Sequence, residues 1–184
     1  MHKGFTLVEL LIVIAILAVL AVTVVVVLNP AELLRQARDS TRISDLAAIN
    51  SAVSLWLTDV STSTWPASGA TCTSGTTQPA TGACTTNAVT AVDGTGWVRN
   101  IDLSAISIGS PLARLPLDPV NNSASTACPA AVPGCFYVFK TAGTFGKYKL
   151  FANMESTKYT PVGTNAKDGG TVNDWYEVGT DMSL

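Results

Sequence analysis

An unbroken apolar run near the N-terminus limits the fold of this chain of 184 residues more than any other feature. The run extends from Leu10 to Leu28, and Thr23 is its single polar residue. As a helix, Phe5–Leu28 would reach about 36 Å at about 1.5 Å per residue, which is enough to cross a bilayer core. A secretory signal would have a shorter apolar core followed by a small-residue cleavage site, and no such site ends this run cleanly. We therefore predict a retained membrane helix.

One acidic residue, Glu9, stands at the front of this run. An isolated carboxylate in a membrane costs about 3 kcal/mol on insertion scales. A cation from a neighbouring chain would offset that cost, and one-to-one pairing of an amine with a carboxylate would also set the axial register of adjacent helices. The alternative interpretation is that Glu9 lies at the membrane interface and extends its carboxylate into water.

The first residues, MHKGFTLVE, place a basic residue, a glycine followed by phenylalanine, and an acid ahead of the apolar run. This combination resembles the class III signal of type IV pilins and related pseudopilins. In that family a membrane peptidase cuts after the glycine, on the cytoplasmic side, and the new N-terminal residue is N-methylated. The resemblance implies a leader of residues 1–4, cleavage between Gly4 and Phe5, methylation of Phe5, and pairing of Glu9 with the N-terminus of a neighbouring subunit.

Residues 29–60 predict a second helical segment after the membrane helix of residues 5–28. Pro30 removes an amide donor and will kink or break a continuous helix. Asn29 as N-cap, Pro30 at the first helical position and Glu32 in a capping box also predict a helix start. Apolar residues then recur on one face at helical spacing: Ile43, Leu46, Ala47, Val53 and Leu57. We expect one long helix, kinked near Pro30, whose second half is amphipathic.

Charged residues lie on the other side of this second segment. Arg35 and Asp39 are spaced i,i+4, and Arg42 and Asp45 are spaced i,i+3, as in helical ion pairs. Two interpretations of these charges stay open: a solvated face, or contacts between subunits.

The four cysteines form two local pairs, Cys72/Cys84 and Cys128/Cys135. Sequence alone does not choose among the three connectivities, but the short spacings in Pro-, Gly- and Thr-rich loops favour the two local bridges. Zinc is the competing interpretation, although the spacings are not of the CxxC type and His2 is the only histidine. Disulfides imply an oxidising compartment.

Residues 61–184 predict a β-rich head. The clearest strands are Phe136–Lys140 and Lys147–Ala152, which flank a Gly-containing turn, and Trp175–Val178 is the expected final strand. An antiparallel sheet of three or four strands, laid over the C-terminal half of the long helix, would bury both amphipathic faces. The sequence therefore predicts an α+β fold, which together with the resemblance implies a pilin fold.

Two stretches of the head carry weaker signals. Residues 61–96 are dominated by Ser, Thr, Ala and Gly, so we expect a long loop there, stapled by the Cys72–Cys84 bridge. Trp97–Ile101 and Ala105–Ile108 are short strand or turn candidates.

The resemblance extends into the head. The stretches LPLDPVNN and DGGTVNDWYEVGTD, with the aromatic hairpin between them, look similar to the heads of major pseudopilins and of pilins with reduced heads. In pseudopilins, acidic residues in the loops of this region bind calcium. The candidate ligands here are Asp118, Asp168 and Asp174, with Asn121, Asn122 and Asn173. No EF-hand spacing is present, so plain Asx-turn chemistry is the competing interpretation, and no other cofactor is expected.

Composition argues against two broad functional classes. A net charge of −2, a pI of about 5.2 and scattered basic residues argue against nucleic-acid binding. His2 would be lost with the leader, which removes the usual Ser–His and Cys–His activation of a nucleophile. No base is placed to activate a serine or threonine, so we expect no enzyme.

The resemblance implies a structural subunit of a type IV pilus. Its precursor would cross the bacterial cytoplasmic membrane once, and a prepilin peptidase/methyltransferase would process it. An assembly platform and ATPase would then build an extracellular filament of identical subunits. A pseudopilin of a type II secretion or DNA-uptake system is the nearest alternative, but the Thr- and Ser-rich insertion between Cys72 and Cys84 is not a pseudopilin feature and favours a pilus. A single-pass membrane protein whose head binds a ligand is an alternative of another class.

Overall fold

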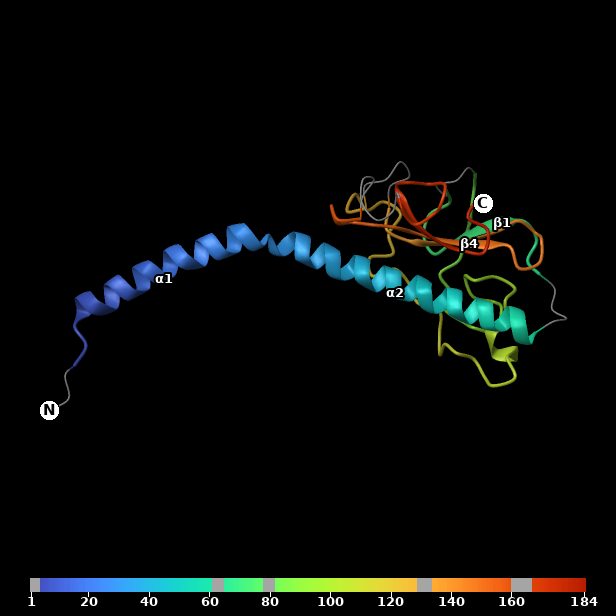
Figure 1. Cartoon of the computed structure of the whole chain (residues 1–184), viewed down its shortest axis with the longest axis horizontal. Helices are drawn as coiled ribbons and strands as arrows, with labels where there is room; N and C mark the ends of the chain where they lie inside the picture. The colour runs from blue at the N-terminus through green and yellow to red at the C-terminus, as the bar shows by residue number, and fades with distance from the viewer. Residues whose placement is uncertain (1–3, 61–64, 78–81, 129–133, 160–166) are drawn as a thin grey trace. The chain divides into compact units, whose positions relative to one another are not determined.

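The computed structural model describes residues 4–60, 65–77, 82–128, 134–159 and 167–184. The chain divides into two compact units, Met1–Arg35 and Gln36–Leu184. Figure 1 traces the chain through its helices and strands. The first unit contains helix α1 and the start of helix α2, and the second contains the remainder of α2 and all strands.

Helix α1 (Leu7–Leu28, 22 residues) forms the first unit almost alone. None of its residues is buried. The single polar side chain of its apolar run, Thr23, donates to Val19 O and Leu20 O at 3.2 and 2.8 Å, so the hydroxyl is satisfied within the helix. The helix is long and apolar enough to cross a membrane.

One residue, Asn29, separates α1 from helix α2 (Pro30–Asp59, 30 residues). Asn29 adopts a left-handed conformation with φ 41° and ψ 71°. A residue before proline is disfavoured in the right-handed helical region, and asparagine tolerates the left-handed one, so the Asn29–Pro30 pair interrupts the helix here. Glu32 N and Leu33 N then donate to Asn29 O as α2 begins. The predicted break near Pro30 is confirmed as this interruption.

The second unit contains a five-stranded sheet in the order β2-β1-β3-β4-β5. Its strands are β1 (Gly69–Cys72), β2 (Thr85–Thr86), β3 (Tyr137–Thr141), β4 (Tyr148–Asn153) and β5 (Trp175–Gly179). Strands β3, β4 and β5 follow one another in antiparallel register, with Phe139 opposite Leu150 and Phe151 opposite Glu177. β1 is antiparallel to β3 and parallel to the short β2.

The sheet carries a core on each face because its side chains alternate. On one face, Tyr137, Phe139, Leu150 and Ala152 pack with the amphipathic side of α2, and on the other, Phe136 lies in a second cluster. The residues of α2 in the first core are Leu46, Ile49, Ala52, Val53 and Trp56. The second core contains Ala70, Cys72, Cys84, Phe136, Val138, Phe151 and Trp175. The α+β fold with a helix on a mainly antiparallel sheet is confirmed.

The head differs from the sequence expectation in one stretch. The region 61–96, expected as a loop, contributes strands β1 and β2. Its Gly and Ala residues disfavour strands, and β1 is defined by its pairing along the whole of Thr141–Val138 on β3. Residues 97–108, expected as strands or turns, form turns and a 3₁₀ helix, η1 (Leu103–Ala105). The hydrogen bond from Ser104 N to the Asp102 side chain at 2.9 Å caps that turn.

A buried ion network fastens α2 to the head. The guanidinium of Arg42 is fully buried and contacts Asp39 at 2.8 Å, Asp118 at 2.6 Å and Glu155 at 2.7 Å. Arg38 forms a second pair with Glu155 at 2.5 Å. The sequence interpretation of Arg42 and its neighbours as a solvated face is wrong, because the partners of Arg42 lie far along the chain at Asp118 and Glu155.

Two further charged residues of α2 also have partners other than those that the helical spacing predicted. Arg35 pairs with Glu32 at 3.6 Å, and Asp45 accepts a hydrogen bond from Tyr137 Oη at 2.8 Å. Burial raises the pKa of the Asp45 carboxyl, and the bond from Tyr137 lowers it in part. The predicted ion pairs Arg35/Asp39 and Arg42/Asp45 are therefore wrong.

Asp39 extends the network to the backbone. Its Oδ1 accepts from Glu155 N at 2.9 Å and its Oδ2 from Ser156 N at 2.8 Å. Burial alone would raise the pKa of the Glu155 carboxyl, but the hydrogen bonds from Arg38 and Arg42 outweigh burial, and this pKa is lowered. The segment after β4 is thus held on α2 by both charges and amides.

Replacing the central cation should destabilise the head strongly. Arg42→Met leaves three carboxylates without their buried counter-ion, so the free energy of unfolding should fall by about 3–5 kcal/mol. Urea unfolding of the full chain in detergent, followed by tryptophan fluorescence, measures this change. Arg35→Met is the matched control, since the half-exposed pair with Glu32 contributes only about 0–1 kcal/mol. Equal small losses in both variants would contradict the role of the network.

Acid should remove the contribution of Glu155. A carboxyl with a lowered folded-state pKa stabilises above its unfolded value of about 4.3, and that stability is lost as the pH falls through the lowered value. Glu155→Gln should therefore cost about 1–3 kcal/mol at neutral pH and progressively less below about pH 4. Urea titrations of both proteins at several pH values measure the difference, and a pH-independent difference would exclude this assignment.

Candidate functional site

The N-terminal segment Gly4–Glu9 brings the predicted processing and assembly residues together. Gly4 and Phe5 lie outside regular secondary structure just before α1, and Phe5 is 85% exposed. A Cβ added at Gly4 would meet no atom within 4 Å. The Gly4–Phe5 peptide bond is thus accessible in the described part of the chain, as the substrate bond of a peptidase has to be. Residues 1–3, the remainder of the predicted leader, lie outside the described residues.

The Glu9 side chain helps to cap the N-terminus of helix α1 in its own chain. Thr6 is the N-cap: its Oγ1 accepts from Glu9 N at 3.2 Å, and Glu9 Oε2 accepts from Thr6 N and Thr6 Oγ1, both at 2.9 Å. This is a capping box, in which two helix-end amides are satisfied reciprocally. The sequence analysis missed Thr6, although the spacing T-x-x-E before an apolar run is a signature of this motif.

The capping box engages one oxygen of the carboxylate. Both donors of Thr6 contact Oε2, and within the described residues Oε1 has no hydrogen-bond or ion-pair partner. The Glu9 carboxylate can therefore accept a further donor without giving up the bonds that start the helix. An amine at that position would gain a charge-assisted hydrogen bond.

The surface of α1 is apolar on all sides. Its large side chains are exposed by between 48% at Val13 and 81% at Val27. Ala15 and Ala18 each line a shallow apolar groove, of about 300 and 340 Å³, together with larger neighbours such as Val19. A helix that is apolar all round belongs in lipid or in a bundle of helices.

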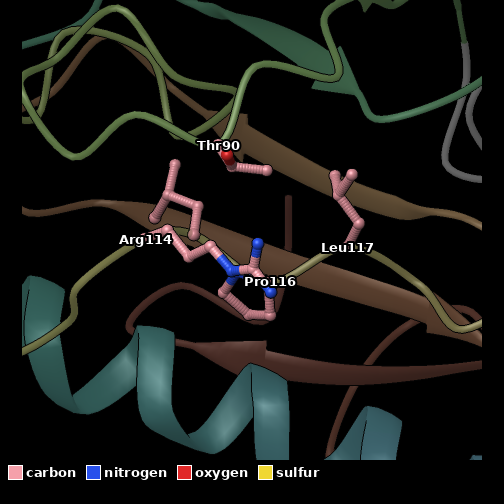
Figure 2. Close-up of a pocket in the computed structure, with 5 residues that line it drawn as sticks. Thr90, Arg114, Pro116 and Leu117 are labelled. Atoms are coloured by element: carbon pink, nitrogen blue, oxygen red, sulfur yellow. The ribbon is translucent and has the colours of Figure 1, made fainter.

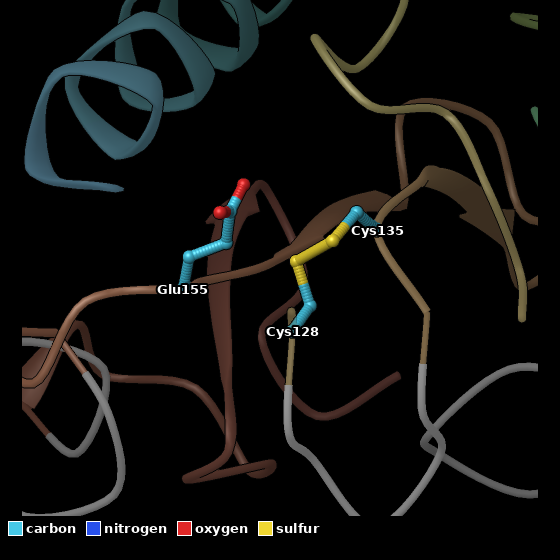
Figure 3. A group of neighbouring side chains, drawn as sticks. All are labelled: Cys128, Cys135 and Glu155. Atoms are coloured by element: carbon cyan, nitrogen blue, oxygen red, sulfur yellow. A yellow bond between two sulfur atoms is a disulfide. The ribbon is translucent and has the colours of Figure 1, made fainter. Parts of the chain in front are cut away.

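The structure pairs the four cysteines as Cys72–Cys84 and Cys128–Cys135, the two local bridges that the spacing favoured. The first bridge joins the end of β1 to the residue before β2, and the second lies before β3. Over the residues that the structure describes, one cluster has the composition of a metal site: Cys128, Cys135 and Glu155. Figure 3 shows that its two sulfur atoms are bonded to each other, and both Glu155 oxygens bind arginines. The sulfur and carboxylate atoms of this cluster are therefore not free to bind a metal ion.

The three candidate calcium ligands do not come together in one cluster. Asp118 binds Arg42 through both carboxylate oxygens, at 2.6 and 3.0 Å, and also accepts from Val120 N and Asn121 N. Asp168 accepts from Gly170 N at 2.8 Å and from Glu177 N at 2.7 Å. Burial raises the pKa of the Asp168 carboxyl more than these amides lower it. Asp174 lies in the loop before β5, and calcium binding there stays a prediction.

A surface cavity of about 350 Å³ in the head is lined by Thr90, Arg114, Leu115, Pro116 and Leu117 (Figure 2). Arg114 is its single charged residue, and the other walls are apolar apart from the Thr90 hydroxyl. A nucleophile needs an adjacent base, and the lining offers none. The arrangement gives no basis for a catalytic site in this cavity.

Residues 1–25 match the family model described as the prokaryotic N-terminal methylation motif. The match covers the predicted cleavage site, Glu9 and most of α1, and it supports the class III signal of type IV pilins and pseudopilins. The motif implies processing by a prepilin peptidase and assembly by pilus-type machinery, from a precursor anchored in the membrane. No curated protein and no solved structure matches the chain.

Proposed function

We propose that this chain is the precursor of a structural subunit of a type IV pilus. The observation that carries the proposal is the match to the methylation motif on a helix whose entire apolar surface is exposed. After cleavage at Gly4 and methylation of Phe5, the subunit leaves the membrane and joins a cell-surface filament. Its function is packing, without catalysis.

The exposed surface of α1 supports polymerisation. Each large apolar side chain gains about 1.5–3 kcal/mol when it is removed from water. Lipid provides that burial for the precursor, and only other apolar helices can provide it once the subunit has left the membrane. Copies of α1 are the available helices in a filament of identical subunits. A head-to-tail contact of this kind does not close, so it generates a helical polymer.

Glu9 sets the axial register of the packed α1 helices. Cleavage creates a positive amine at Phe5, and the amine of a neighbouring subunit would bind the carboxylate through the oxygen that Thr6 leaves open. In a bundle of apolar helices an unpaired carboxylate is costly, so subunits that are out of register are disfavoured. The pair thus selects one axial offset between helices.

The head supports an extracellular destination. Two disulfides persist in an oxidising compartment, and the Arg42 network fastens the head to α2 without further chains. A pseudopilin of a secretion or DNA-uptake system would use the same N-terminal motif in a shorter polymer. The insertion closed by Cys72–Cys84 favours the pilus, because it adds exposed surface to the head.

Substitution of Glu9 separates its two roles. Glu9→Gln keeps an acceptor for the capping box but removes the charge, whereas Glu9→Ala removes both. Both variants should be inserted and processed but assemble poorly, with a filament yield at least about tenfold below wild type, since one lost charge pair is worth at least about 1.4 kcal/mol. Sheared filaments quantified by immunoblot provide the measurement. A normal filament yield from Glu9→Gln would show that Glu9 acts as a helix cap and that its charge is not needed for assembly.

The mass of the mature subunit tests the processing. Electron microscopy should show long surface filaments, and mass spectrometry of peptides from their subunit should find an N-terminus at Phe5 that carries one methyl group, together with both disulfides. An intact Met1 would refute cleavage, and a processed subunit without long filaments would favour the pseudopilin.

A further inference from the structure

A lysine and a glutamate form a fully buried pair between the last two strands. Lys149 lies on β4 and Glu177 on β5, and both side chains have zero exposure. The Lys149 Nζ to Glu177 Oε1 distance is 2.7 Å. Phe151, directly opposite Glu177, lies under the amine with its ring centroid 4.8 Å from Nζ. The pair therefore belongs to the sheet face that α2 does not cover.

The amine of Lys149 is held in one orientation. It donates to Thr171 Oγ1 at 3.1 Å and to the carbonyl oxygen of Met182 at 2.9 Å, whereas its 2.7 Å contact with Glu177 Oε1 is an ion pair outside hydrogen-bond geometry. An ammonium has three protons, so these two acceptors leave one proton for transfer to Glu177. That transfer leaves a neutral amine whose two remaining protons are bound by Thr171 and Met182.

The carboxyl group of Glu177 is equally constrained. Its Oε2 accepts from Val172 N at 3.0 Å. A Cβ at Gly170 would lie 1.5 Å from Oε2, so the carboxyl sits directly on a glycine backbone. Asp168 holds this loop in place, since its two oxygens accept from Gly170 N and Glu177 N. Asp168 is thus a positioning residue for the pair.

From this geometry we propose that Lys149 and Glu177 condense into an intramolecular isopeptide bond that joins β4 to β5. The reactants are the neutral amine and the carboxylic acid that proton transfer within the pair produces. Low polarity favours that transfer, because burial penalises both charged forms. The site needs no metal, cofactor or second protein for this step.

The reaction balances without an oxidant or reductant. Nζ attacks Cδ of Glu177, and the Nζ–Cδ bond forms while the Cδ–Oε1 bond breaks. Oε1 leaves as water with the proton from the acid and one proton from Nζ. The product is a secondary amide and one water molecule. During the attack the negative charge on Oε2 is stabilised by Val172 N, as in an oxyanion hole.

Two features of the site favour condensation over the free pair. Groups held in contact reach effective concentrations of about 10⁵ M or more. The zero exposure of both side chains keeps bulk water from hydrolysing the product.

Mass spectrometry of the full chain tests the proposal directly. Purified wild-type protein, reduced and denatured, should be lighter by one water than its processed, methylated sequence. Proteolysis should yield a branched peptide that joins the Lys149 segment to the Glu177 segment, and trypsin should not cleave after Lys149. Lys149→Met should show neither change. Lys147→Met is the matched control and should keep both, since Lys147 forms an exposed pair with Asp181 at 3.4 Å.

Two results would overturn the proposal. A wild-type mass equal to that of the processed, methylated sequence would show that the pair stays ionic. A loss of one water with separate, trypsin-cleaved Lys149 peptides would assign the loss to another reaction, such as cyclisation at Asp168–Gly169. Because the wild-type mass and peptides decide by themselves, the conclusion does not depend on whether Lys149→Met folds.

Discussion

The constraint on which the account depends is an apolar helix with no buried residue. Every side chain of α1 is exposed, while the residues from Gln36 onward form their own compact unit. Such a surface has no stable state in water, so the chain has to be covered by lipid or by other helices. The break at Asn29–Pro30, the buried anchor of α2 and the disulfide-bonded head all fit a subunit whose two parts serve different surroundings.

Charges fix local geometry within each of these parts. In the head, Arg42 gathers Asp39, Asp118 and Glu155 in a site without water-exposed side chains. At the N-terminus, Glu9 satisfies the helix start and keeps one oxygen open. In the head, a buried charge is tolerated only with a partner, and the need for the partner fixes the geometry; the same rule would apply to Glu9 once other helices cover it. Lys149 and Glu177 follow this rule on the far face of the sheet.

The sequence predicted what is local. The apolar run, the break at Pro30 and the strand pairs around the Gly143–Gly146 turn depend on neighbouring residues, and all are found in the structure. The buried network was missed because Arg42 meets Asp118 and Glu155, whose separations from it, 76 and 113 residues, leave no pattern in a window of sequence. β1 and β2 were missed for a related reason, since they are short and the partner that orders them, β3, lies far along the chain.

Cryo-electron microscopy of filaments sheared from cells tests the central claim most directly. The account predicts a core of packed α1 helices in which the Glu9 carboxylate lies within about 4 Å of the Phe5 amine of a neighbouring subunit. A filament whose α1 helices lie outside the core would contradict it. So would a core in which the Glu9 carboxylate has Thr6 of its own chain as its single partner.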